Sequence, residues 1–164
     1  RNDMKKMLDG LERLLSIICT GLFLCIAILI AVQVFTRYVM DHTLAWSEQA
    51  ARGAFIWLIM LYSGVLVRKG GNLGFDILVK RLPPAGKHIC QFICEIAILV
   101  FSCYWFYQGI LLCQSFVGFT LSGLQLPYNV LYVAEPVGAF LIALFDLELL
   151  VNHVKQVKEG GLHA

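Results

Sequence analysis

The residues of this chain that are capable of chemistry are few, and the most suggestive of them surround the junction between two long apolar runs. Arg37, Trp46, Glu48 and Arg52 lie within a stretch of 16 residues. Glu48 and Arg52 are four residues apart, so their side chains face each other on a helix, and tryptophan is a typical anchor at the membrane surface. The group fits an ion-pair network that clamps two helices together, and it fits equally well a docking surface for another protein.

Acidic residues inside the apolar runs form a second candidate set, of which Glu95 and Glu135 are the clearest members. Ionisable residues inside membrane segments are functional candidates by default. One hypothesis is a proton or ion pathway through the chain. The other is that both acids pair with a partner subunit or extend to the lipid headgroups. The second is favoured, because no two acids share a helix face at the bilayer centre and the chain has no internal repeat of the transporter kind. Asp146 and Glu148 lie near the end of the last run and are expected to reach water.

The cysteines and histidines do not form a pattern typical of catalysis or metal binding. The closest cysteines, Cys90 and Cys94, are separated by three residues instead of the two of a redox Cys-x-x-Cys motif, so all six cysteines are interpreted as membrane-buried thiols. The histidines stand at the ends of the apolar runs or in the tails: His42, His88, His153 and His163. We therefore expect no catalytic residue, no cofactor and no metal site, and a membrane redox enzyme is the least favoured function.

The composition identifies lipid as the natural solvent of this chain. Of its 164 residues, 59% are apolar and 15% charged, and the mean hydropathy is +0.76. Soluble domains have about 45–50% apolar and about 25% charged residues, and a soluble globule of this size has too little interior to hide so much apolar surface. A net charge of +2 without a dense basic run gives no indication of a nucleic-acid partner.

Four membrane-crossing helices are predicted, because a helix needs about 20 apolar residues to cross the hydrocarbon core. The first span is 14–36, and the second is 44–67 with an amphipathic start. The 39 residues from Ile96 to Ala134 carry no charge and are too long for one crossing. The chain must therefore turn back within this stretch.

Gly118, Gly123 and Pro127 locate that turn, since glycine and proline interrupt helices. The third and fourth spans are then 89–116 and 128–151. Pro136 is expected to kink the fourth, because proline removes a backbone donor.

The predicted fold class is all-α: an integral membrane four-helix bundle that forms a single domain over 1–164. A short interfacial helix is expected at 73–82, between spans two and three, where apolar residues recur near helical spacing between glycine and proline pairs.

The distribution of lysine and arginine predicts the orientation. Basic residues flank the N-terminus, the segment between spans two and three, and the C-terminus, whereas the turn between spans three and four has none. The positive-inside rule therefore places both termini and the middle segment in the cytoplasm.

Several short motifs resemble the small membrane subunit of tripartite ATP-independent periplasmic (TRAP) transporters. Their order along the chain is Arg37-Tyr38-Val39, Trp46-Ser47-Glu48, Ala51-Arg52, Trp57, Arg68-Lys69-Gly70 ahead of Asp76, Leu82-Pro83, Leu126-Pro127, Pro136 and Gly138. The resemblance extends from about Leu14 to Val151, and the chain departs from it at Asn72, where the family often has histidine.

The resemblance implies an accessory role in the bacterial inner membrane. In that family a periplasmic binding protein captures an organic anion, such as a sialic acid, another sugar acid or a dicarboxylate. A large membrane subunit moves it, coupled to sodium, and the small subunit packs against the large one. Arg37, Glu48 and Arg52 would then contact the large subunit or the docked binding protein. The alternative is a small homo-oligomeric exporter that uses Glu95 or Glu135 as its proton site.

Overall fold

The computed structural model of the chain describes residues 2–39, 45–70, 84–121 and 126–160. It consists of helices, with one isolated bridge between Thr120 and Pro127. The elements are α1 (Asn2–Val39), α2 (Ala45–Arg68), α4 (Pro84–Ser115), α5 (Asn129–Tyr132) and α6 (Ala134–Gly160). Four segments are long and apolar enough to cross a membrane, which confirms the predicted all-α membrane fold. The interfacial helix predicted at 73–82 lies outside the described residues.

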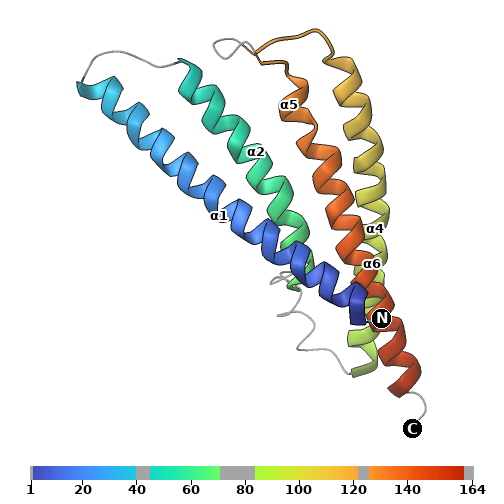
Figure 1. Cartoon of the computed structure of the whole chain (residues 1–164). Helices are drawn as coiled ribbons and strands as arrows, with labels where there is room; N and C mark the ends of the chain where they lie inside the picture. Colours follow the sequence, from blue (N-terminus) through green and yellow to red (C-terminus); the bar gives the residue numbers. More distant parts are fainter. Residues whose placement is uncertain (1, 40–44, 71–83, 122–125, 161–164) are drawn as a thin grey trace.

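The helices pack in a row rather than around a central axis (Figure 1). α1 packs on α2, α2 on α6, and α6 on α4, with the short α5 continuing the line of α6. We call the end of this row at which α1 begins and α6 finishes the terminus end, and the opposite end the far end. The helices converge at the terminus end and spread apart towards the far end, so the four-helix bundle is open.

The buried core lies nearer the terminus end because α1 extends well beyond its apolar run. The first 12 residues of this 38-residue helix precede the predicted span. They continue the helix as an amphipathic segment, in which Leu8 is buried while Lys5 and Lys6 are exposed. The core cluster joins three helices through Leu8, Leu15, Cys19, Leu61, Val65, Leu141 and Phe145.

Two glycines allow α6 to approach its neighbours closely. A Cβ atom on Gly138 would lie 2.8 Å from Cβ of Met60 and 2.9 Å from its carbonyl oxygen, and one on Gly109 would lie 2.9 Å from Cδ of Pro136. A larger residue has no room at either contact. Small residues of this kind are typical of helix interfaces in membranes, where close backbone approach replaces the hydrophobic driving force.

The fourth span differs from the single kinked helix that the sequence predicts. It is divided at Val133 into α5 and α6, and Pro136 lies in the first turn of α6. An amide in the first turn has no helical acceptor in any case, so proline costs little there. Ahead of this break, Gly118 adopts a positive φ of 93° at the predicted turn, whereas Gly123 lies outside the described residues.

Candidate functional site

The most extensive polar cluster of the described residues is at the terminus end and is centred on Arg68, the last residue of α2. Its Nε donates to Glu148 Oε2 of α6 at 2.8 Å, and its Nη1 donates to Glu12 Oε2 of α1 at 2.6 Å. The guanidinium also donates to Asp9 Oδ1 and to the Leu8 carbonyl oxygen. One side chain therefore joins three helices.

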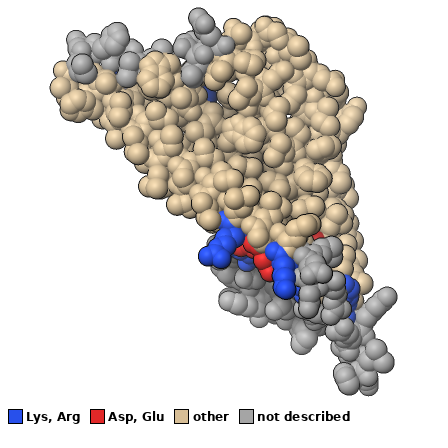
Figure 2. All heavy atoms as spheres, in the orientation of Figure 1, with Lys and Arg blue, Asp and Glu red and all other residues tan. Residues whose placement is uncertain are grey.

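The surroundings of Arg68 are those of a sheltered ion-pair network. The Arg68 side chain is 10% exposed, Glu148 12% and Glu12 24%, whereas Asp9 is 67% exposed. The Arg68 Cζ atom also lies 5.5 Å from the centre of the buried Phe145 ring, a cation–π distance. We call Asp9, Glu12, Arg68 and Glu148 the Arg68 cluster. Figure 2 shows that charged side chains gather at this end, below a broad uncharged surface.

This cluster is not predicted from the sequence, in which Arg68 is one of several basic residues that indicate the orientation. The expectation that Glu148 reaches water is wrong, because its side chain is 12% exposed and is bonded to Arg68. The sequence does contain a signal for this cluster: Asp9 and Glu12 are three residues apart just before the first predicted span, at the same predicted membrane end as Arg68 and Glu148. Which of them meet depends on helix rotation, which that pattern does not specify.

A second polar contact joins α4 to α6 at the same end. His153 Nδ1 lies 3.1 Å from Glu95 Oε2, and the His153 ring packs edge-on against Phe92. Glu95 thus finds a partner within its own chain. Glu135 is half-buried at the start of α6 and makes no hydrogen bond or ion pair with another described residue.

Asp146 of α6 is buried, contrary to the expectation from the sequence. Its side chain is fully buried, and neither carboxyl oxygen has a hydrogen-bond partner among the described residues. Glu95 of α4 is close enough to act on it electrostatically. The expectation that Asp146 reaches water is wrong, because the α4–α6 contact covers it. Burying an unpaired carboxylate is costly.

The residues predicted around the first junction are only partly brought together at the far end. Arg52 Nη2 lies 3.2 Å from Glu48 Oε1, but both belong to α2 and both side chains are about 60% exposed. Arg37 is exposed at the end of α1 and pairs with no residue that the structure describes, and Trp46 is also exposed. The Glu48–Arg52 ion pair therefore lies within α2, and no described ion pair of these four residues joins α1 to α2.

The outer face of α4 carries a polar pair in an otherwise apolar setting. Gln108 Nε2 donates to the Tyr104 hydroxyl at 2.7 Å, and both side chains are exposed. Phe101 and Trp105 stack edge-to-face beside them, at 5.1 Å between ring centres. Together these four residues line a shallow surface hollow.

No feature of a catalytic or metal centre is found in the described part of the chain. No three histidine, cysteine or acidic side chains converge there as metal ligands. All six cysteines lie in described helices as free thiols.

Comparison with known proteins connects this arrangement to a transport family. Residues 7–156 match the family model of the DctQ component of tripartite ATP-independent periplasmic transporters. The chain is 25% identical over 165 residues to a TRAP transporter small permease protein of Haemophilus influenzae, covering 96% of this chain and 98% of that one. It is 20% identical over 152 residues to the sialic acid TRAP transporter small permease protein SiaQ of Vibrio cholerae, covering 93% and 86%.

A third relative has a different organisation. It is the isethionate TRAP transporter permease protein DctMQ of Oleidesulfovibrio alaskensis, 28% identical over 140 residues. The match covers 80% of this chain but 22% of that protein. Most of that relative therefore has no counterpart here.

Proposed function

The chain belongs to the DctQ component family of tripartite ATP-independent periplasmic (TRAP) transporters, and from this premise we propose that it is an accessory subunit that packs against a large permease and does not itself carry the solute. It is a multi-pass membrane component of a transporter and not an enzyme. The relative named DctMQ supports a large permease as its partner, since that single protein contains a match to this chain within a much longer sequence.

The observation that carries the proposal is the Tyr104–Gln108 pair on the outer face of α4. The span runs over Ile89–Ser115, so Tyr104 lies near its middle. At about 1.5 Å per residue, Gln108 is about 9 Å from the midpoint, within the apolar half-thickness of about 15 Å. Both residues are thus expected at hydrocarbon depth on a face that this chain leaves uncovered.

Lipid tails offer no hydrogen-bond partner to the Tyr104 hydroxyl or the Gln108 amide. The Gln108 amide has two donors and a carbonyl acceptor, of which the described contact with Tyr104 uses one donor. Polar side chains in membranes pair across helices because hydrocarbon offers no alternative partner. A helix of the large permease with a polar side chain at this depth would complete the bonding.

The burial of the four spans also favours α4 as the helix that contacts the large permease. In the most apolar window of the α4 span 6% of residues are buried within the chain, against 39% in the span that contains α6. α6 is the central helix of the row, and α4 is an outer one. A helix at the edge of the row has the largest free face for a partner.

Photo-crosslinking tests this proposal. The chain is co-expressed with a large TRAP permease from the same organism, with p-benzoylphenylalanine replacing Tyr104 in one variant and Ile28, an exposed residue of α1, in the control. We expect a crosslink to the large permease from position 104 and none from position 28. Crosslinking from position 28 alone would reject α4 as the contact face, and failure of the two proteins to co-purify would reject the accessory role.

We further propose that Arg37, Trp46, Glu48 and Arg52 face the periplasm and contact the large subunit or the docked binding protein. Their exposure at the far end supports this. Arg52→Ala and Glu48→Ala are expected to lower solute uptake while the chain still inserts and co-purifies. Wild-type uptake in both variants would remove these residues from the interface.

The names of the relatives support a proposal for the solute and the coupling ion. Relatives are named for isethionate and sialic acid, which are both organic anions, so we propose sodium-coupled uptake of an organic anion by the complete complex in the inner membrane. Uptake into proteoliposomes with and without an inward sodium gradient tests this. The alternative, a self-sufficient exporter with a proton site at Glu95 or Glu135, predicts transport by this chain alone.

The proposed orientation has both termini in the cytoplasm. The charged terminus end would then lie at the cytoplasmic surface, in agreement with the positive-inside rule. Reporter fusions at the two ends test the orientation, and activity of a periplasm-specific reporter at either end would contradict it.

A further inference from the structure

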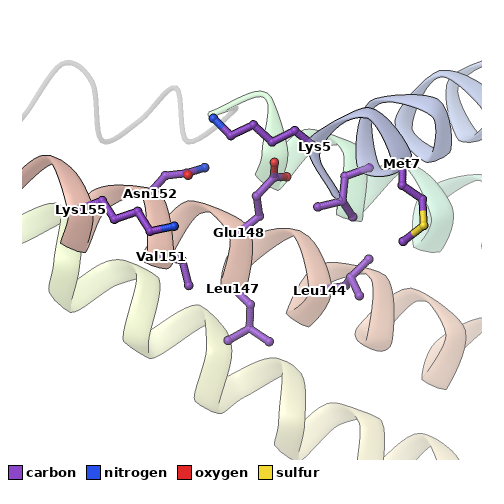
Figure 3. A pocket seen from close by; sticks show the side chains of 9 residues that line it. Lys5, Met7, Leu144, Leu147, Glu148, Val151, Asn152 and Lys155 are labelled. Carbon is purple, nitrogen blue, oxygen red and sulfur yellow. The ribbon is translucent and has the colours of Figure 1, made fainter. Parts of the chain in front are cut away.

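A groove between α1 and α6 at the terminus end is not used by the proposed subunit contact. It has a volume of about 300 Å³. It exists because α1 packs mainly on α2, which leaves the outer side of α6 uncovered between them. Figure 3 shows the lining side chains, with Lys5 and Met7 contributed by α1 and the remaining labelled residues by α6.

The groove is amphipathic. Its floor is apolar and is formed by Leu144, Leu147 and Val151 of α6. Its rim carries Lys5 and Lys155, which are both exposed and form no ion pair with a residue that the structure describes.

The two other polar side chains of the groove are Glu148 and Asn152. Glu148 is the one acid of the lining and accepts from Arg68 at 2.8 Å, so the lining has two lysines against one carboxylate. Asn152, one helical turn before Lys155 on the polar side, offers an amide that can donate to an oxygen anion. The rim therefore has a net positive character above an apolar floor.

The position of the rim matches the depth of lipid headgroups. The predicted fourth span ends at 151, so Lys155 lies about one helical turn beyond the apolar run. Lys5 lines the same groove from the amphipathic start of α1. The rim thus lies just outside the apolar run, and the apolar floor extends inward from it. Basic pockets between membrane helices at this depth are suited to anionic lipid headgroups.

We propose that this groove is a binding site for an anionic phospholipid, with an acyl chain along Leu144, Leu147 and Val151 and the headgroup phosphate between Lys5 and Lys155. The occupant is a lipid and not a soluble phosphate compound, because the floor offers apolar surface that only an acyl chain would use. All residues that line the groove belong to this chain, so lipid binding can be measured without the large permease.

The test measures binding of dioleoyl phosphatidylglycerol to the purified chain in detergent by native mass spectrometry at low ionic strength. Dioleoyl phosphatidylcholine serves as the zwitterionic comparison. The test variant is Lys5→Gln/Lys155→Gln. The matched control is Lys6→Gln/Arg13→Gln, which removes the same charge from exposed α1 positions outside the groove. Circular dichroism verifies that both variants keep their helices.

Each lysine near an anionic headgroup contributes about fivefold in affinity. We therefore expect phosphatidylglycerol binding to weaken on the order of 25-fold in the Lys5/Lys155 variant and to change little in the control. Val151→Trp, which fills the floor from an exposed position, is expected to weaken binding as well. Glycerol phosphate at the same concentration should not displace the lipid.

Three results would overturn the site. Equal losses in the two double variants would mean diffuse attraction by the charged terminus end. Equal affinity for phosphatidylcholine would remove the role of the lysines. Displacement by glycerol phosphate at matched concentration would show a phosphate site without an acyl-chain component.

Discussion

Replacement of Arg68 is the sharpest test of how this chain is held together. Arg68→Met keeps an apolar stem of similar length and removes the charge that three carboxylates share. Glu148 and Glu12 would then remain, 12% and 24% exposed, without their main partner. Breaking a buried ion pair by removing one partner costs about 3–5 kcal/mol, so we expect the free energy of unfolding to fall by about 3 kcal/mol or more.

The exposure of the three acids predicts a ranking of their individual contributions. Glu148→Gln is expected to cost about 1.5–3 kcal/mol, because it removes hydrogen bonds to a charged group in the most sheltered position. Glu12→Gln should cost less. Asp9→Asn should cost about 0–1 kcal/mol, since a carboxylate that is 67% exposed is screened by solvent.

Reversible unfolding by dodecyl sulfate in mixed micelles, followed by circular dichroism, gives these free energies. Arg52→Met is the matched control, because it removes the same charge from an exposed pair within one helix; its expected cost is below about 1 kcal/mol. The double variant Arg68→Met/Glu148→Met should recover part of the loss, since apolar replacement of both partners removes the unpaired charge. Equal costs for Arg68→Met and Arg52→Met, or for Asp9→Asn and Glu148→Gln, would refute this reasoning.

Three further predictions use the same unfolding measurement. Asp146→Asn should stabilise the chain by about 1 kcal/mol or more, because it removes a charge from a fully buried site without hydrogen-bond partners; destabilisation would indicate a partner for the carboxylate. Gly138→Ala should cost about 1–3 kcal/mol by overlap with Met60, whereas Gly21→Ala, where nothing lies within 4 Å, should be neutral or slightly stabilising. Trp57→Phe should cost about 1 kcal/mol by removing the 2.9 Å bond from the indole Nε1 to the Val130 carbonyl, and an unchanged midpoint would show that water replaces it.

The number of predicted spans agrees with the number of long apolar helices in the described residues, because hydropathy is a local property. A run of about 20 apolar residues has one stable location in a membrane. The structure extends these spans where the sequence is amphipathic. α1 begins at Asn2, well ahead of the apolar run, since Leu8 and Leu15 face the core there.

Most of the polar contacts could not be predicted from the sequence. Glu48 and Arg52 lie on one helix, and the rule for residues four apart places them together. The contact of Glu95 with His153 and the contacts of Arg68 with α1 and α6 join residues more than 50 positions apart. They depend on which helices are neighbours and on how each is rotated.

The amino-acid sequence by itself determined that this chain forms four helices long and apolar enough to cross a membrane, because length and apolarity are read directly along the chain. The ordered motifs also indicated the family. The tertiary structure alone decided the open row of helices, the burial of Asp146, the bonding of Arg68 and the groove between α1 and α6. The physical reason is that lipid is as apolar as the helix interior, so the pattern of apolar residues does not distinguish a face that meets lipid from one that meets another helix.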